Sequence, residues 1–187
     1  MALTVGDRTV RPLTADEVMR MVDAGILAED EPVELLHGVL TEVSVKIPEH
    51  EELKMRLVRW LDPTAEGHRV RIEGALVVPD RTSLPEPDIA VVEPASYLTA
   101  HPSSALLVIE VAVSSLRTDT RIKPALYAAA GVPEVWVVDV SARRLIVLRD
   151  PAPGGYATET VLGREDHAQP LHVDVGPLEL AELFRGL

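Results

Sequence analysis

Residues 105–113 read ALLVIEVAV, a run in which Glu110 is the only polar side chain. An apolar, β-branched run of this length predicts a strand covered on both faces, as in the middle of a sheet. An ionised carboxylate buried there without a partner costs several kcal/mol or takes up a proton. The run therefore predicts either a strand placed so that Glu110 is exposed, or a cation close to it.

The length and composition of the chain allow one well-filled core. The chain has 187 residues, of which 47% are hydrophobic, so we expect a single domain over residues 1–187. It contains no cysteine, which excludes disulfides and thiolate zinc sites and suits a reducing cytosol. The first residues carry charges where a signal peptide needs an apolar core, and no run approaches the ~18 apolar residues of a membrane span. We therefore expect a cytoplasmic protein that makes no membrane contact.

The chain is acidic, with thirty Asp and Glu against eighteen Lys and Arg and a formal charge of −12. Such a charge repels polyanions at long range, although a local basic face can outweigh the total within a Debye length. The arginines available for such a face are Arg56, Arg59, Arg69, Arg71, Arg117 and Arg121. If they gather, they favour a nucleic-acid substrate; if they scatter, they favour a binding or assembly module.

The hydrophobic periodicity predicts helices and strands in alternation. Helices are expected over residues 14–25, 48–62, 118–130 and 176–187. Strands are expected over 33–45, as a hairpin that turns at His37-Gly38, and over 68–78, 87–93, 105–113, 133–140, 143–150 and 155–162. The strand, helix and strand between residues 105 and 140 imply a crossover unit. We therefore expect a mixed sheet within an α/β fold.

A second carboxylate can be set beside Glu110. In LPEPDIAVV, Pro85 and Pro87 fix an extended conformation and place Asp88 at the first position of a strand. The spacing between Asp88 and Glu110 allows one strand, a loop and the return into a neighbouring strand. Two carboxylates on adjacent strands repel each other unless a cation lies between them, and such oxygen ligands suit Mg²⁺ or Mn²⁺. A divalent ion would explain the buried glutamate.

Three segments in order, LPEPDIAVV, LLVIEVAVSSL and DTRIKPALYAAAGVPEVWVVD, resemble the Uma-type family of endonucleases. This family lies within the PD-(D/E)XK restriction-endonuclease-like superfamily, and the resemblance runs from Glu34 to Val140. It implies a restriction-endonuclease-like fold of the α/β class, a mixed β-sheet flanked by α-helices. It also implies a metal-dependent endonuclease, a hydrolase of phosphodiester bonds that acts on DNA; RNA stays open as a substrate.

The resemblance also implies the residues of the site. The glutamate near the start of the family pattern falls on Glu34, in VELLHGVL, the aspartate of the Pro-Asp element on Asp88, and the glutamate of the next strand on Glu110. The superfamily's lysine two residues further on is replaced by Ala112, and the Uma-type pattern moves it to the following helix, at Lys123. Glu34, Asp88, Glu110 and Lys123 are the expected catalytic residues.

Phosphodiester hydrolysis needs an ion that polarises the phosphoryl oxygen and acidifies a bound water, and a cation that offsets charge in the transition state. We expect Asp88, Glu110 and the carbonyl of Val111 to hold Mg²⁺ or Mn²⁺, and Lys123 to orient or activate the water. Glu34 would complete the coordination directly or through water. Pro124 follows the lysine, so the helix must begin late or bend there.

Three functions remain open. The leading one is a metal-dependent endonuclease, expected as a homodimer because cutting both strands suits a symmetric pair. The second is a nuclease-like fold that has lost catalysis and serves as a binding or assembly module, which Ala112, Val113 and the acidity fit better. The third is a small-molecule phosphoesterase, which would use the same carboxylates.

Other motifs in the sequence give less information about function. HEELK, which begins at His50, resembles the start of a zinc-protease helix, but Lys54 takes the place of the second histidine, so that motif fails. We expect His50 near a helix start, facing the site. Tyr127 and Trp136 are expected to pack in the core. The sequence has no phosphate-binding glycine loop, which disfavours a nucleotide-triphosphate enzyme.

Overall fold

A six-stranded mixed sheet forms the centre of the computed structural model, which describes residues 4–28, 30–43, 47–62 and 66–187. Its spatial order is β10-β9-β8-β7-β6-β5, and the neighbours pair antiparallel except for β7 and β8, which are parallel. The strands are β5 (Arg69–Ile72), β6 (Ile89–Val92), β7 (Leu107–Ala112), β8 (Glu134–Asp139), β9 (Arg144–Ala152) and β10 (Gly155–Leu162). The predicted mixed sheet of an α/β fold is confirmed.

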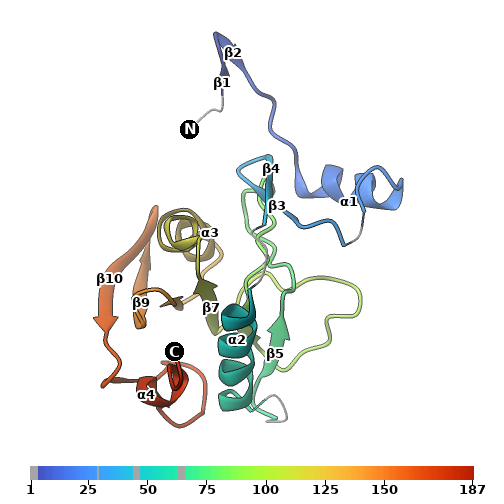
Figure 1. The fold of residues 1–187 in the computed structure, drawn as a ribbon. Helices are drawn as coiled ribbons and strands as arrows, with labels where there is room; N and C mark the ends of the chain where they lie inside the picture. Colours follow the sequence, from blue (N-terminus) through green and yellow to red (C-terminus); the bar gives the residue numbers. More distant parts are fainter. Residues whose placement is uncertain (1–3, 29, 44–46, 63–65) are drawn as a thin grey trace.

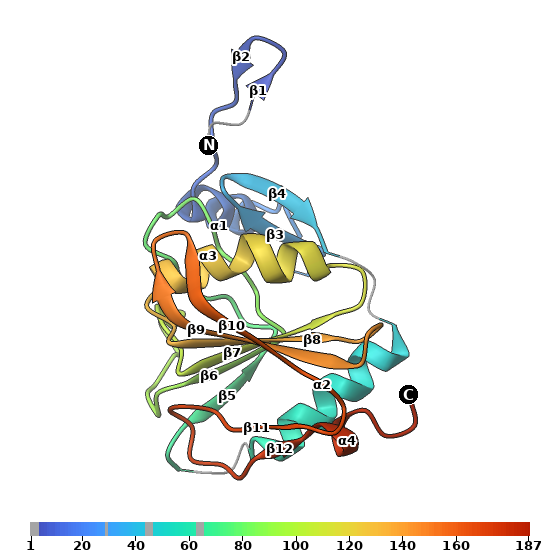
Figure 2. The ribbon, with the colours of Figure 1, turned by 90° about the vertical axis from the view of Figure 1, so that its left-hand side faces the viewer.

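Two helices cover opposite faces of this sheet, α2 (Pro48–Trp60) and α3 (Lys123–Ala129), as Figure 2 shows. Leu53 and Leu57 of α2 pack in one core cluster, and Tyr127 of α3 packs in the other. Every residue of β7 is buried, because both faces of the strand are covered. Glu110 lies inside the protein, so the strand does not slip to expose it.

The crossover from β7 to β8 runs through a π-helical turn, η1 (Thr118–Ile122), which continues into α3. Pro124 lies in the first turn of α3, where a residue without an N–H is tolerated. The helical segment runs without a break over residues 116–129, so the irregularity that this proline requires is the π-helical turn before it rather than a late start, and Lys123 is the first residue of the regular helix.

A smaller layer lies beyond α3. It contains α1 (Ala15–Asp23) and the hairpin of β3 (Val33–Leu36) and β4 (Val39–Glu42), which turns at His37 and Gly38, both with positive φ. Leu36 of β3 shares a small apolar cluster with Leu126 of α3 and with Val78, and this cluster docks the hairpin on the helix. A terminal hairpin, β1 (Thr4–Val5) with β2 (Arg8–Thr9), extends away from the body of the protein (Figure 1).

The C-terminal segment returns to α2. It forms β11 (His167–Ala168), β12 (Leu178–Glu179) and α4 (Leu180–Leu183), and Leu180, Leu183 and Phe184 join the core cluster of α2. The helix expected over 176–187 is therefore much shorter, because residues 178 and 179 pair with β11 instead.

Two expected strands also differ from the observed ones. The strand expected over 68–78 ends at Ile72, because the backbone turns at Glu73, whose φ is 50° and whose N–H bonds to the Asp88 carbonyl. The second strand of the hairpin expected over 33–45 ends at Glu42, and residues 44 and 45 lie outside the described residues. Among the described helices, none is long and apolar enough to cross a membrane.

Candidate active site

Asp88 and Glu110 meet at one end of two neighbouring strands. The antiparallel register pairs Ile89 with Ile109, so Asp88, one residue before β6, lies beside Glu110 of β7. Asp88 Oδ2 accepts a hydrogen bond of 2.7 Å from the Val111 N–H, and the Asp88 N–H points to Glu110 Oε2 at 3.4 Å. The two carboxylates predicted from the sequence to share a site therefore lie together.

The cation next to Glu110 is Lys123. Its Nζ lies 3.2 Å from Glu110 Oε1, 2.9 Å from Glu34 Oε1 and 3.9 Å from Asp119 Oδ1. The lysine side chain is only 7% exposed, so these carboxylates are its main surroundings. The start of α3 thus turns the lysine inward to the sheet, despite the proline that follows it.

Glu34 reaches the site from the outer hairpin. Its Oε1 accepts from the Glu86 N–H at 2.8 Å as well as pairing with Lys123. Glu86 belongs to the proline-rich segment just before Asp88, so Glu34 joins that segment to the lysine. Its described contacts are with Lys123 and this segment rather than with Asp88.

Tyr127 is a member of the site that the sequence interpretation missed. It is buried in the core as expected, but its hydroxyl donates to Glu110 Oε1 at 2.5 Å. Asp119, Lys123 and Tyr127 follow each other at intervals of four residues, which brings side chains to one face of a helix. That spacing was the signal available in the sequence.

His50 reaches Asp88 from the other side of the sheet. It lies in the first turn of α2, and its Nε2 is 3.0 Å from Asp88 Oδ1. The hydrogen bond to Asp88 raises the pKa of His50 above its ordinary value, although burial acts in the opposite direction. Lys54, one turn further along α2, is also buried and pairs with Glu51 and Glu73. The expectation that His50 faces the site is confirmed.

Carboxylates outnumber cations in this cluster. Burial, followed by the charges of Asp119, Asp88 and Glu34, raises the pKa of Glu110 well above its ordinary value, while Lys123 opposes the rise. Burial alone would lower the pKa of Lys123, but the surrounding carboxylates outweigh it and raise that pKa. Lys123 therefore stays an ammonium, and the negative charge of the carboxylates is only partly compensated.

The donors present fit a divalent cation by their chemistry. Asp88 and Glu110 supply hard oxygen ligands, and the uncompensated negative charge favours a cation. The Val111 carbonyl lies on the strand edge that faces Asp88, because a strand residue's N–H and C=O point to the same side. Within the described part of the chain, no three His, Asp or Glu side chains already stand together as a metal cluster. Lys123 and Tyr127 hold Glu110 Oε1, so this carboxylate must reorient to bind an ion.

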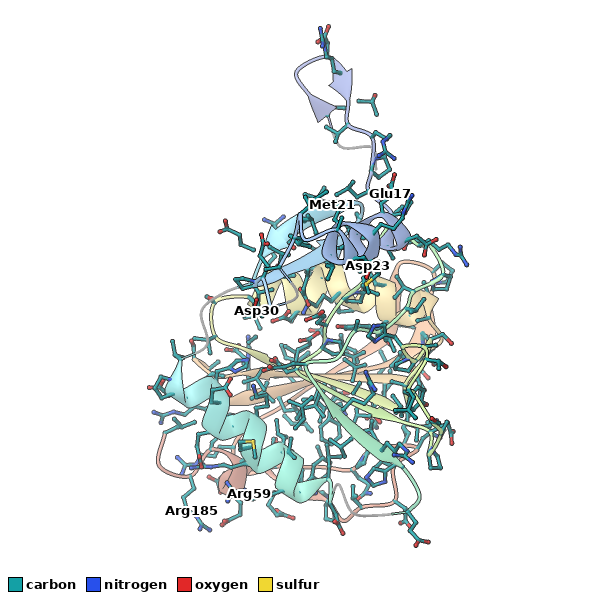
Figure 3. The ribbon with its side chains drawn as sticks, turned by 90° about the vertical axis from the view of Figure 1, so that its right-hand side faces the viewer. Glu17, Met21, Asp23, Asp30, Arg59 and Arg185 are labelled. Atoms are coloured by element: carbon teal, nitrogen blue, oxygen red, sulfur yellow. The ribbon has the colours of Figure 1, made fainter. Side chains whose placement is uncertain are left out.

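The arginines do not form one basic face. Arg56 and Arg59 lie on α2, whereas Arg117 and Arg121 lie beside α3, across the sheet. Figure 3 shows Arg59 and Arg185 on the α2 side, far from the acidic side chains labelled on and near α1. Arg56 Nη1 also donates to the carbonyls of Leu183 and Arg185. The net charge of −12 is therefore not offset by one gathered patch of these arginines.

Comparisons with known proteins agree on the kind of fold. The family model described as "Uma2: Putative restriction endonuclease" matches residues 16–177. The structure is similar to the crystal structure of a "putative nuclease belonging to DUF820 from Anabaena variabilis ATCC 29413", with a TM-score of 0.72 and 17% identity over 92% of this chain and 98% of that chain. A search of the curated proteins found no match. At this identity the structural similarity shows the fold alone, whereas the family model covers most of the chain.

Proposed function

The chain belongs to the Uma2 family, described as "Putative restriction endonuclease", and on that premise we propose that it is a metal-dependent nuclease that hydrolyses phosphodiester bonds in DNA. The observation that carries the proposal is the meeting of Asp88, Glu110 and Lys123 at one end of β6 and β7. Two carboxylates beside a buried ammonium are what phosphodiester hydrolysis requires: ligands for an ion, and a positive charge close to it.

Asp88, Glu110 and the Val111 carbonyl would hold Mg²⁺ or Mn²⁺. When bound, the ion supplies polarisation of the phosphoryl oxygen and acidification of a water molecule. Lys123 keeps its proton, because the carboxylates raise its pKa, so its role is to offset negative charge rather than to act as a general base. Glu34 and Tyr127 position Lys123 and Glu110 through the contacts at 2.9 Å and 2.5 Å.

We further propose that the protein is a homodimer in the cytoplasm. A symmetric pair would present one site to each strand of a duplex. The absence of cysteine supports a reducing compartment. Sedimentation at micromolar concentration tests the first point: a dimer supports it, and a monomer contradicts it.

The substrate is tested by incubating the purified chain with plasmid DNA, single-stranded DNA and RNA, each with Mg²⁺, with Mn²⁺ or with a chelator. The expected result is cleavage of DNA that needs a divalent ion and disappears in an Asp88→Ala variant. Cleavage that persists in the variant or in chelator would assign the activity to a contaminant. Cleavage of RNA alone would keep the nuclease and change its substrate.

A second candidate is a nuclease-like fold without catalysis that serves as a binding or assembly module. The observations that favour it are the dispersed arginines, the net charge of −12 and the engagement of Glu110 by Lys123 and Tyr127. The same incubations separate the two: this candidate predicts intact DNA with every ion. Hydrolysis of a small phosphodiester with intact DNA would instead indicate a small-molecule phosphoesterase.

A further inference from the structure

The imidazole ring of His50 is oriented by a carboxylate on each side. Its Nδ1 lies 3.1 Å from Glu51 Oε1, and its Nε2 lies 3.0 Å from Asp88 Oδ1. The side chain is 11% exposed, so the ring is enclosed. A histidine that binds a metal almost always gives its other ring N–H to a carboxylate, carbonyl or water, which fixes the tautomer and leaves the second nitrogen free to coordinate. Glu51 occupies that supporting position.

The distance between His50 and Asp88 also suits two ligands of one ion. In octahedral coordination with bonds of about 2.1 Å, neighbouring ligand atoms lie about 3.0 Å apart. The observed separation of Nε2 and Oδ1 is 3.0 Å. A hydrogen bond has the same length, so in the metal-free protein a proton can hold the place that an ion would take. Both ligand atoms could then bind an ion with little movement of either backbone.

We propose that His50 Nε2 is a ligand of the divalent ion at Asp88, and that the site therefore binds Mn²⁺ in preference to Mg²⁺. Imidazole nitrogen is a good ligand for transition ions, whereas Mg²⁺ is bound mainly through oxygen. The two-residue set of His50 and Asp88 forms one half of the site, and Glu110 or the Val111 carbonyl supplies the rest. This inference rests on the proposed metal-dependent function and deepens it by naming the ion.

The test measures ion binding by the full chain, with Mn²⁺ alone and with Mg²⁺ alone, by calorimetry and by electron paramagnetic resonance of the Mn²⁺ complex. His50→Gln is the decisive variant, because the glutamine amide can still donate to Asp88 but offers no ring nitrogen. Because the variant removes a ligand itself, we expect it to lose at least the roughly 10–100-fold in Mn²⁺ affinity that the loss of an outer-shell partner of a ligand costs. Its Mg²⁺ affinity should change far less, and the nitrogen hyperfine coupling that we expect in the wild-type Mn²⁺ complex should be absent. His167→Gln, at an exposed position in β11, should leave all three readouts unchanged.

Two results would overturn the inference while leaving the proposed nuclease intact. One is Mn²⁺ bound to the wild type without any nitrogen coupling, a measurement that needs no variant and so does not depend on the folding of His50→Gln. The other is a folded His50→Gln with the wild-type ratio of Mn²⁺ to Mg²⁺ affinity, which would reduce His50 to a hydrogen-bond partner of Asp88. A wild type that binds neither ion would overturn this inference and the proposed metal dependence together.

Discussion

The Lys123 ammonium and the Glu110 carboxylate form a buried ion pair, with 3.2 Å between Nζ and Oε1. This pair answers the question raised by a glutamate in the middle of an apolar strand. The cation comes from the helix that follows the strand, and it enters beside Glu34 and Asp119 as well. Carboxylates outnumber the Lys123 ammonium in this cluster. Removing the charge of Lys123 should therefore destabilise the protein, whereas removing the charge of Glu110 should not.

Replacing Lys123 by Met should destabilise the protein strongly. The substitution keeps the apolar stem but leaves Glu34, Glu110 and Asp119 without their shared cation, and breaking a buried ion pair costs about 3–5 kcal/mol. The loss in the free energy of unfolding should be smaller in mild acid, where the carboxylates take up protons. Denaturant unfolding at two pH values measures it. Arg117→Met, at an exposed position, is the matched control and should change little.

Replacing Glu110 by Gln should leave the metal-free protein as stable as the wild type or more stable. Burial and the neighbouring carboxylates raise the pKa of Glu110 above its ordinary value of 4.5, so as the pH falls the folded chain takes up this proton, and loses the ion pair with Lys123, before the unfolded chain does. The free energy of unfolding of the wild type should therefore fall as the pH rises from the ordinary pKa of Glu110 to its raised pKa in the folded chain, by up to about 1 kcal/mol per pH unit.

Glutamine carries no titrating proton, so the variant should show a flatter curve of unfolding free energy against pH. Denaturant unfolding between about pH 5 and about pH 8 compares the two proteins. A severely destabilised Glu110→Gln would identify Glu110 as a structural partner of Lys123 rather than as a carboxylate kept for an ion.

Replacing Tyr127 by Phe should change metal binding at the site and also lower the free energy of unfolding. The hydroxyl donates to Glu110 Oε1 at 2.5 Å, and losing a hydrogen bond to a charged group costs about 1.5–3 kcal/mol, although Lys123 still faces the same oxygen. Tyr156→Phe is the matched control, because its hydroxyl donates to the Val132 carbonyl away from the cluster. Both variants should lose stability, but only Tyr127→Phe should change Mn²⁺ affinity, measured by calorimetry. Equal Mn²⁺ affinities in the two variants would confine Tyr127 to packing.

Replacing Glu34 by Gln tests a role next to the lysine rather than next to the ion. The amide oxygen still accepts from the Glu86 N–H, but the charge that faces Lys123 is lost. We expect a loss of about 1–3 kcal/mol in unfolding free energy and a slower cleavage rate, with Mn²⁺ affinity nearly unchanged. Glu42→Gln, exposed on β4, serves as control. A large fall in Mn²⁺ affinity would place Glu34 in the coordination of the ion instead.

The sheet and its buried strands could be predicted because the residue pattern of each strand indicates that both of its faces are buried. Apart from their acidic residues, LVIEVA and EVWVVD are apolar on both sides, as is typical of a covered, partly parallel sheet, and the helix between them indicates the crossover. Glu110 and Asp88 were found from the residues around them, whereas Glu34 and Lys123 came from the family resemblance. The structure brings the four into one connected cluster.

Contacts between distant elements could not be predicted in the same way. From the sequence, Tyr127 is indistinguishable from an ordinary core residue. Its hydroxyl faces Glu110 because of the position of α3 on the sheet. The supporting contact of Glu51 with His50 depends on how the first turn of α2 meets Asp88. The strand that ends at Ile72 likewise depends on a turn at Glu73 that bonds to the Asp88 carbonyl, a tertiary contact without a local signal.

The most direct test of the central claim is the rate of plasmid nicking in saturating Mn²⁺ by the wild type and by folded Asp88→Asn and Glu110→Gln variants. The account predicts nicking by the wild type that stops in chelator, and a loss of about 100-fold or more in each variant, because each removes a charge at the reacting centre. Wild-type protein that leaves the plasmid intact, or a variant that nicks as fast as the wild type, would contradict it.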